Sequence, residues 1–290
     1  MISMTRRAII ALTAAGLLAP ALPAVAQDSL QARVDARKVT VGIHNRRPWG
    51  YRDADGNVAG FHPDLVRAAL EPLGITEIDF IISDFGALIP GLQARRFDMI
   101  ASGISVTPER CAQVIFSEPD LSVGDAILVN KGNPKQVFSF EDIKNNTDFV
   151  LGGGRGTLNT KDALAAGIPE DRVEQFPGAQ EALSALMAGR VDGNVMSGPT
   201  ALMMLEDPNV GDKLERVTPF TGLLRANGEP VALYTAIAFR PDDTELRDAY
   251  NARLAEMTAD GTVAEIRARY GFSDDEAAPS YTTADICAGL

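Results

Sequence analysis

The hydrophobic and polar positions of the chain form short alternating segments separated by longer helical patterns. The segment KVTVGI at residues 38–43 alternates as a half-buried strand does. The predicted N-terminal elements are a strand at 38–43, a hairpin turn at 53–57, a helix at 62–73, a strand at 78–82, a helix at 88–92, a strand at 98–100 and a loop at 101–108. This alternation of strands and helices predicts a mostly parallel sheet covered by helices, with ligand-bearing loops at the carboxyl ends of its strands.

A second series of strands and helices surrounds a turn-like break, KGNP, at residues 131–134. Its predicted elements are strands at 126–130, 149–151, 191–196 and 232–239, a glycine-rich loop at 152–157, helices at 158–166 and 179–188, and helices again up to residue 270. A chain that leaves one α/β lobe and later returns to it forms a hinge beside a cleft. The expected divisions are a signal peptide at 1–26, a first lobe at 27–129, a second lobe at 130–232, and a return to the first lobe with the C-terminal tail at 233–290.

The N-terminal segment has the three parts of an export signal. Arg6 and Arg7 precede an apolar run at residues 8–22, and the small residues at 24–26 predict cleavage after Ala26. The pair of arginines also fits a twin-arginine signal, so both export routes stay open. A membrane anchor is a weaker interpretation because the run is short and ends in a cleavage pattern. We expect a periplasmic protein.

Composition and charge exclude several classes of function. The chain has 290 residues, 46% hydrophobic and 23% charged, which is typical of a globular protein. Its net charge of −12 argues against nucleic-acid binding, because that affinity rests on lysine and arginine at phosphates. Two histidines and two cysteines are too few for an ordinary Cys/His zinc site, and we expect neither a metal nor a cofactor. The sequence shows no nucleophile motif, so an enzyme is not expected.

Four segments carry a family resemblance: DFGALIPGL at 84–92, FDMI at 97–100, TPER at 107–110 and FSEP at 116–119. In this order and spacing they resemble the periplasmic solute-binding proteins of ABC importers, in the polar amino acid family. Together with KGNPK they are most similar to the subgroup that binds ectoine and hydroxyectoine. The resemblance implies a type II fold with two α/β lobes, a small-molecule solute in the cleft, an inner-membrane ABC permease as partner, and a monomer.

The resemblance also assigns ligand contacts. The assigned residues are Arg46, Trp49, Phe85, Ser102, Gly103, Ser105, Arg110, Thr157, Asn159 and Ser197. An arginine in the place of Arg110 takes a ligand carboxylate in a bidentate pair, although the motif alone would also fit a surface arginine. Phe85 is expected as an aromatic floor or a core residue, and Gly103 and Ser105 as contacts or turn formers. Thr157 is expected to offer its hydroxyl to the ligand, to cap a helix, or both.

Some positions depart from the family pattern. Ser197 stands where relatives that bind an α-ammonium have aspartate, so a standard α-amino acid is less expected. The ectoine subgroup has an acidic residue where this chain has Arg46, and a cage aromatic where it has Ser105, whereas Trp49 and Phe85 match cage aromatics. Two arginines without a carboxylate partner suit a more acidic ligand. The expected solute is ectoine or hydroxyectoine, with another polar or acidic amino acid or organic acid as the alternative.

The two cysteines and the two histidines of the chain also allow predictions. Cys111 and Cys287 are predicted to form a disulfide, with two free thiols as the alternative. His44 and His62 are expected to be structural or surface residues.

Two other functions are possible on this fold. A cyclohexadienyl-dehydratase-like enzyme would need carboxylates in the cleft, and a receptor domain would need a membrane or signalling segment after Tyr281. Neither feature is seen in the sequence.

Overall fold

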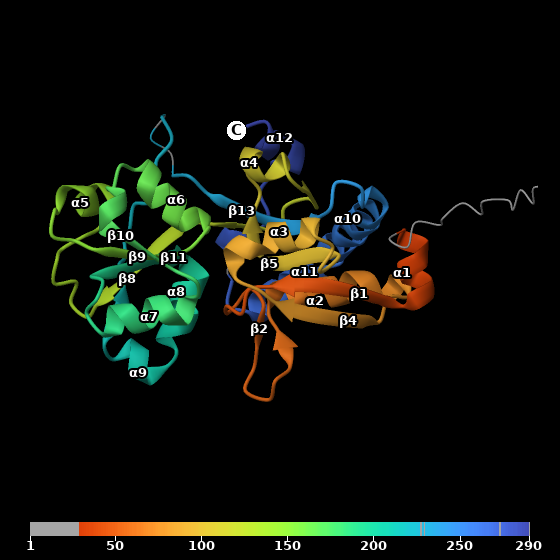
Figure 1. Cartoon of the computed structure of the whole chain (residues 1–290), viewed down its shortest axis with the longest axis horizontal. Helices are drawn as coiled ribbons and strands as arrows, with labels where there is room; N and C mark the ends of the chain where they lie inside the picture. The colour runs from red at the N-terminus through yellow and green to blue at the C-terminus, as the bar shows by residue number, and fades with distance from the viewer. Residues whose placement is uncertain (1–28, 227, 229, 273, 290) are drawn as a thin grey trace, which may run out of the picture.

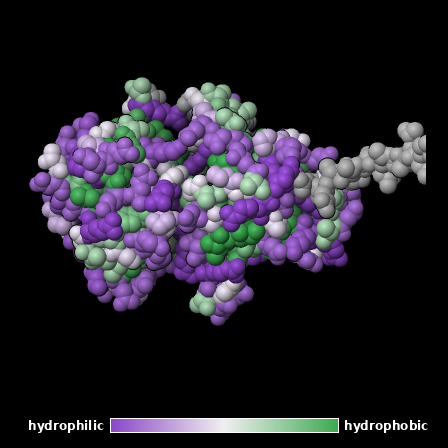
Figure 2. Space-filling model, viewed as in Figure 1, coloured by the Kyte–Doolittle hydropathy of each residue, from purple (hydrophilic) through white to green (hydrophobic). Residues whose placement is uncertain are grey.

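The computed structural model describes residues 29–226, 228, 230–272 and 274–289, so the predicted signal peptide lies outside the described residues. Two α/β lobes lie side by side, each with its own sheet covered by helices (Figure 1). The space-filling view shows the lobes in contact along a narrow seam, on a face that is mostly hydrophilic (Figure 2). None of the helices in the described part of the chain is long and apolar enough to cross a membrane.

The sheet of the first lobe contains strands from both ends of the chain. Its strands are β4 (Glu77–Ile82), β1 (Lys38–Ile43), β5 (Met99–Ser105), β13 (Leu233–Phe239) and β6 (Ile115–Phe116), in this order, with β7 (Leu121–Val123) also paired to β13. Strand β1 pairs in parallel with β4 and β5, whereas β13 is antiparallel to β5. The antiparallel strand β13 is the one that returns from the second lobe.

Helices of the first lobe cover this sheet, and a small hairpin extends beside the seam (Figure 1). The helices and the hairpin strands are α1 (Leu30–Ala36), α2 (Phe61–Leu70), α3 (Leu88–Gln93), α4 (Pro108–Cys111), α10 (Thr244–Ala259), α11 (Thr262–Arg269), α12 (Thr283–Cys287), β2 (Tyr51–Arg52) and β3 (Val58–Ala59), with 3-10 turns at Glu71–Leu73, Phe85–Ala87 and Asp274–Glu276. Val41, Leu65 and Phe239 belong to the core between the sheet and α2, α10 and α11, and all three are fully buried.

The second lobe is built around a sheet of five strands. Its strands are β10 (Val173–Phe176), β9 (Leu151–Gly154), β11 (Gly193–Ser197), β8 (Asp125–Asn130) and β12 (Leu214–Arg216), in this order. Its helices are α5 (Phe140–Asn145), α6 (Leu158–Ala165), α7 (Ala179–Met187), α8 (Gly198–Leu205) and α9 (Pro208–Gly211), with a 3-10 turn at Glu170–Arg172. Helices α6, α7 and α8 start directly after strands or short loops, so their N-termini are placed at one edge of the sheet.

The crossing into the second lobe comes earlier than the sequence analysis placed it. Strand β7 belongs to the first sheet and β8 to the second, so the chain crosses near Gly124 and not at residue 130. The turn-like residues that suggested the later boundary form a turn within the second lobe, where Gly132 and Asn133 both have positive φ. Turn residues mark a reversal of the chain as readily as a linker. The return crossing precedes β13, which begins at Leu233.

Two segments expected as loops are strands. Strand β5 continues through Ser105, and all seven of its residues are buried, although residues 101–105, which are small apart from Ile104, resemble a loop in composition. It lies between β1 and β13, which pair with its two ends, and the backbone N–H of Gly103 in the middle donates to His62. Residues 152–154 likewise belong to β9. A Cβ at Gly153 would lie 2.3 Å from the Thr160 hydroxyl, so glycine lets helix α6 pack directly on this strand.

The C-terminal helix is joined covalently to the first lobe. A disulfide links Cys111 in α4 with Cys287 in α12, with the two Cα atoms 5.8 Å apart. Thr282 caps α12, and its hydroxyl and backbone exchange hydrogen bonds with Asp285. The tail is thereby fixed beside the helix that carries Arg110.

Candidate functional site

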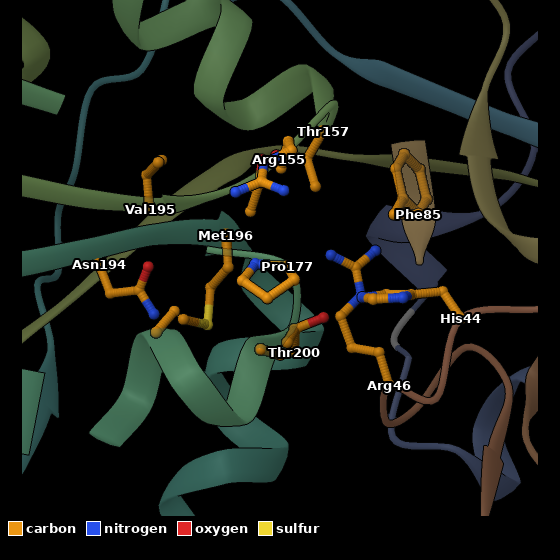
Figure 3. A pocket seen from close by; sticks show the side chains of 13 residues that line it. His44, Arg46, Phe85, Arg155, Thr157, Pro177, Asn194, Val195, Met196 and Thr200 are labelled. Atoms are coloured by element: carbon orange, nitrogen blue, oxygen red, sulfur yellow. The ribbon is translucent and has the colours of Figure 1, made fainter. Parts of the chain in front are cut away.

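Two narrow chambers adjoin between the lobes, and both are lined by Arg46, Phe85 and Thr157 (Figure 3 shows the first). The Asn194 chamber is lined by His44, Arg46, Phe85, Gly154, Arg155, Thr157, Pro177, Ala179, Ala182, Asn194, Val195, Met196 and Thr200. The Trp49 chamber is lined by Arg46, Trp49, Phe85, Gly103, Ser105, Val123, Thr157, Leu158, Asn159, Ser197, Leu233 and Thr235. The volume that the centre of a water molecule can occupy is about 20 Å³ in the first chamber and about 10 Å³ in the second. Each chamber therefore has room for about one water, and the lobes are closed on each other.

Eight of the ten predicted ligand contacts line the Trp49 chamber. They are Arg46, Trp49, Phe85, Gly103, Ser105, Thr157, Asn159 and Ser197. Ser102 and Arg110 line neither chamber. The Ser102 hydroxyl is fully buried and accepts a hydrogen bond of 2.6 Å from the backbone N–H of His44, so it ties β5 to the end of β1.

Arg110 lies beside the chambers and connects the two lobes. Thr107 caps the short helix α4 and places Arg110 in its first turn. The guanidinium donates to the carbonyl of Ser105 at 2.8 Å and, across the cleft, to the carbonyl of Gly156 at 3.0 Å. Burial lowers the pKa of Arg110 to about 10, while the charges of Glu109 and Asp162 oppose this shift. In the closed form this cation has oxygen partners in both lobes.

Arg46 lines both chambers and has no such partners. Its side chain is 8% exposed and makes no hydrogen bond or ion pair with the described residues, and its Nε is buried without an acceptor. Figure 3 shows the guanidinium beside His44, pointing into the space between Phe85 and Arg155 of the other lobe. Burial lowers the pKa of Arg46 to about 10, and no carboxylate of the described residues offsets the effect. The segment itself is fixed, because the backbone N–H of Arg46 donates to Gly50 at 3.0 Å.

Phe85 contacts both arginines. Its ring is 94% buried, and the guanidinium carbons of Arg46 and Arg110 each lie 5.6 Å from its centroid. His44 approaches the same ring edge-on at 5.7 Å. Cations over an aromatic face are favourable, so Phe85 holds both arginines in place and offers its ring to the chambers.

Trp49 connects the first lobe with helix α8 of the second. The indole is buried, stacks on His62 with a ring separation of 5.5 Å, and donates from Nε1 to the Thr200 hydroxyl at 3.0 Å. The Thr200 hydroxyl in turn lies 2.9 Å from that of Ser197. This aromatic wall of the Trp49 chamber therefore has its one polar group bound to the opposite lobe.

His62 positions the strand beneath Trp49. Its Nδ1 accepts a hydrogen bond of 2.7 Å from the backbone N–H of Gly103, so the ring proton is on Nε2, which donates to Asp120 at 3.1 Å. Asp120 also accepts a hydrogen bond from Thr235. Gly103 has a φ of +64°, and a Cβ there would lie 2.5 Å from the Trp49 ring. His62 is thus structural, as expected, and it fixes the position at which backbone and indole meet.

The second lobe contributes neutral polar groups. Thr157 caps α6, and its hydroxyl donates to the carbonyl of Gly154 at 2.9 Å. Asn159 donates to Asp125 at 2.6 Å. Within the described residues no aspartate or glutamate lines either chamber. There is also no group of three or more metal-ligating side chains in the part of the chain that the structure describes.

The lobes also touch backbone to backbone. Gly156 of the second lobe has a φ of +74°, and a Cβ there would lie 3.1 Å from the Cα of Gly86 in the first lobe. Outside the chambers, Lys161 forms an ion pair of 2.5 Å with Glu109 across the seam. These contacts show how closely the two lobes approach each other.

Sequence reasoning missed several lining residues, His44 and Asn194 among them. His44 was expected to be a structural or surface residue rather than a ligand, and the structure places it in the lining of the Asn194 chamber. Its position two residues before Arg46, at the end of a strand, was the available signal. Burial and then the charge of Arg46 lower the pKa of His44 to about 4, so its ring is neutral near pH 7. Asn194 lies within β11, and its buried Oδ1 has no partner in the described part of the chain.

Comparison with known proteins places this fold and cleft in a family. Residues 39–273 match the bacterial extracellular solute-binding proteins, family 3. A probable amino-acid ABC transporter periplasmic-binding protein of Sinorhizobium fredii (strain NBRC 101917 / NGR234) is 35% identical over 253 residues, which cover 86% of this chain and 82% of that protein. The arginine-binding protein 1 of an ABC transporter in Escherichia coli (strain K12) is 30% identical, over 80% of this chain and 89% of that protein.

Solved structures give the same result. EhuB in complex with hydroxyectoine has a TM-score of 0.83 and 35% identity, covering 91% of this chain and 99% of that one. An ancestral amino acid-binding protein described as a precursor of cyclohexadienyl dehydratase has a TM-score of 0.73 and 28% identity, covering 83% and 98%. The expected type II periplasmic binding protein fold is confirmed. The chain belongs to the bacterial extracellular solute-binding proteins, family 3.

Proposed function

We propose that this protein is the periplasmic solute-binding subunit of an ABC importer, and that it acts as a monomer after cleavage behind Ala26. It captures one small, carboxylate-bearing, amino-acid-like solute between its lobes and presents the closed form to a membrane permease. The observation that carries the proposal is the joint placement of eight predicted contact residues around one buried chamber. Its chemistry requires no catalytic group, in line with the transport proteins of the family.

Ectoine and hydroxyectoine are the first candidates for the solute. The structural similarity to EhuB with hydroxyectoine supports them, as do the two aromatic side chains, Trp49 and Phe85, in the chamber wall. Another polar or acidic amino acid or organic acid is the alternative, supported by the buried cation of Arg46. Both candidates carry a carboxylate.

Closure provides the signal for transport. A solute shifts the equilibrium toward the closed form only to the extent that it binds that form more tightly than the open one. Three contacts across the seam exist only when the lobes meet: Trp49 to Thr200, Arg110 to Gly156, and Lys161 to Glu109. A solute in the chambers adds its own contacts to both lobes, which is the differential affinity that closure needs.

The test is a thermal-shift screen of residues 27–290 against ectoine, hydroxyectoine, the standard amino acids and small dicarboxylates. A compound that binds only the folded protein increases the free energy of unfolding, by about 2.7 kcal/mol at a concentration of a hundred times its Kd. The melting temperature rises as a result. We expect at least one compound to bind with one-to-one stoichiometry in calorimetry. Absence of any binder in the panel would contradict the proposal, and turnover of a bound compound would show an enzyme instead.

Two phenylalanine variants locate the binding site. Phe85→Ala removes the ring between the chambers, and Phe138→Ala removes a ring that is 46% exposed on the second lobe. We expect Phe85→Ala to lower the affinity at least about tenfold, because the ring supports both arginines and contacts the solute. Phe138→Ala should leave the affinity unchanged, and equal losses in the two variants would place the solute elsewhere.

A further inference from the structure

Arg46 is a buried cation for which the described residues provide no partner. Its side chain is 8% exposed, its Nε has no acceptor, and its guanidinium points into the closed space between the lobes. A charge removed from water costs several kcal/mol unless another charge or strong hydrogen bonds compensate for it. The closed form, as it stands, leaves this cost uncompensated.

No acid lines the two chambers that Arg46 shares with the other lobe. In the Asn194 chamber, the neutral ring of His44 and the ring of Phe85 come from its own lobe, and Arg155, Thr157 and Thr200 come from the other. Arg46 also borders a larger, open pocket lined by the exposed Glu206 and Asp207, and among the described residues it forms an ion pair with neither. The exposed carboxylates Asp84 and Glu181 influence His44, but none offsets the burial of Arg46. Among the described residues, the chambers themselves therefore supply no group that neutralises Arg46 in the closed form.

We propose that Arg46 is an anion-binding residue of the cleft, and that the solute is net anionic: a small dicarboxylate or an acidic amino acid with one carboxylate on Arg46. This inference rests on the proposed function, and within it favours the acidic alternative over ectoine and hydroxyectoine as the solute. A guanidinium and a carboxylate form two parallel charge-assisted hydrogen bonds, and Nε together with one Nη offers that geometry. The ring of Phe85 beside the guanidinium restricts its orientation.

A net-neutral solute fits less well because its positive group finds no anion in the chambers. Ser197 provides only a hydroxyl at the position facing Asp125 in the neighbouring strand, and that hydroxyl pairs with Thr200. Asp125 itself lines neither chamber and accepts a hydrogen bond from Asn159. An amidinium or ammonium in this space would add a second cation to that of Arg46.

The proposal also explains why an anion would drive closure. In an open cleft water solvates Arg46, and its attraction to a solute carboxylate is weak. In the closed cleft the water is excluded, so the same pair is stronger and replaces the lost hydration. An anionic solute therefore stabilises the closed form more than the open one, because the charge of Arg46 is most costly when the cleft is closed.

Calorimetry with four defined compounds tests this. Succinate, L-glutamate, hydroxyectoine and L-arginine are titrated into the wild type, Arg46→Gln and Arg47→Gln. Arg47 is the matched control, since it is the next residue, is exposed and lies 4.6 Å over the ring of Tyr51. We expect succinate or glutamate to bind the wild type at least about tenfold more tightly than hydroxyectoine, and Arg46→Gln to lose about 10- to 100-fold of that affinity. Arg47→Gln should stay within about twofold, since an exposed charge contributes little.

A second readout locates the anion without relying on a variant. The chain has two histidines, and only His44 lines a chamber with Arg46, so the NMR signals of the two imidazole rings can be followed separately. Addition of the acidic compound should shift the His44 signals and leave those of His62 in place. Thermal melts of Arg46→Gln without solute confirm that the variant is folded, and its melting temperature should equal or exceed that of the wild type.

The outcomes separate this inference from the proposed function. Tight binding of hydroxyectoine with no binding of either acid overturns the anionic solute and supports the transport role. Binding of an acid that Arg46→Gln does not weaken overturns the role of Arg46. Binding of none of the four compounds overturns the anionic-solute inference, while a binder in the larger panel still supports the proposed function.

Discussion

The two arginines beside Phe85 are alike in position and unlike in partners. Both guanidinium carbons lie 5.6 Å from the ring centroid, and burial lowers the pKa of each to about 10. The guanidinium of Arg110 donates to carbonyls in both lobes, whereas that of Arg46 donates to nothing in the described part of the protein. Equal burial therefore does not mean equal demand for a solute: in the closed form one arginine holds the lobes together, and the other is free to bind a carboxylate.

The segments that carry the two arginines also differ in their support. Arg110 lies in α4, which the disulfide between Cys111 and Cys287 joins to α12. Arg46 lies in a loop after β1 that a backbone hydrogen bond to Gly50 holds. If this contrast is correct, damage to the disulfide affects the Arg110 side of the cleft far more than the Arg46 side.

The largest effect is expected from removal of the disulfide. Cys111→Ser combined with Cys287→Ser should lower the free energy of unfolding by about 2–5 kcal/mol, because the link closes a long loop of the unfolded chain. Urea denaturation followed by circular dichroism measures it, and reduction of the wild type is the control. A loss below about 0.5 kcal/mol would show that packing alone fixes α12 beside Arg110.

A smaller, pH-dependent effect is expected at Asp162, a carboxylate whose charge acts on Arg110, whereas no carboxylate of the described residues offsets the burial of Arg46. Asp162 is 5% exposed, and burial, with a contribution from Asp125, raises its pKa to about 7 against the opposing charge of Arg110. The folded state holds this proton more tightly than the unfolded one. The associated stability is therefore complete below about pH 4 and is lost as the pH rises through about 7.

Asp162→Asn should accordingly stabilise the protein at pH 8 by roughly 1–3 kcal/mol and change little at pH 4. Melting temperatures of the wild type and the variant between pH 4 and pH 8 give the comparison. Asp171→Asn, at an exposed position, is the control and should follow the wild type across the range. A constant offset between Asp162→Asn and the wild type at every pH would contradict the assignment.

The smallest effect is expected at the contact between Trp49 and Thr200. Trp49→Phe removes the indole donor and should weaken solute binding about fivefold, since one inter-lobe hydrogen bond contributes about 1 kcal/mol to the closed form. Thr200→Val removes the acceptor, and the double variant separates this bond from the other effects of each change. Fully additive losses in affinity would mean that the bond does not stabilise the closed form.

The sequence predicted the lobes and most of the cleft, because strand alternation and the family segments both report on local structure. Trp49, Gly103, Thr157 and Ser197 each follow a strand that the alternation predicts, and all line the Trp49 chamber. The sequence could not predict which groups form hydrogen bonds across the two lobes. Whether Arg110 donates to a ligand or to the carbonyl of Gly156 depends on the distance between two lobes that no local pattern encodes.

The same reason explains the errors in boundaries. Residues 101–105 are small apart from Ile104, as in many loops, and only the place of β5 between β1 and β13 makes them a buried strand. The turn at residues 131–134 has the composition of a linker, and only the pairing of β8 with β11 and β12 assigns it to the second lobe. Long-range neighbours decided both cases.

The close approach of Gly156 to Gly86 sets a limit on how far the molecule can shut. A single methyl group at Gly156 would already touch the opposite backbone, at 3.1 Å, on a residue whose φ of +74° disfavours any side chain. Rotation of the lobes toward each other is thus limited by the contact between the backbones at Gly156 and Gly86. The volume available to the solute in the closed form is therefore limited by this contact between two backbones as well as by the side chains that line the chambers.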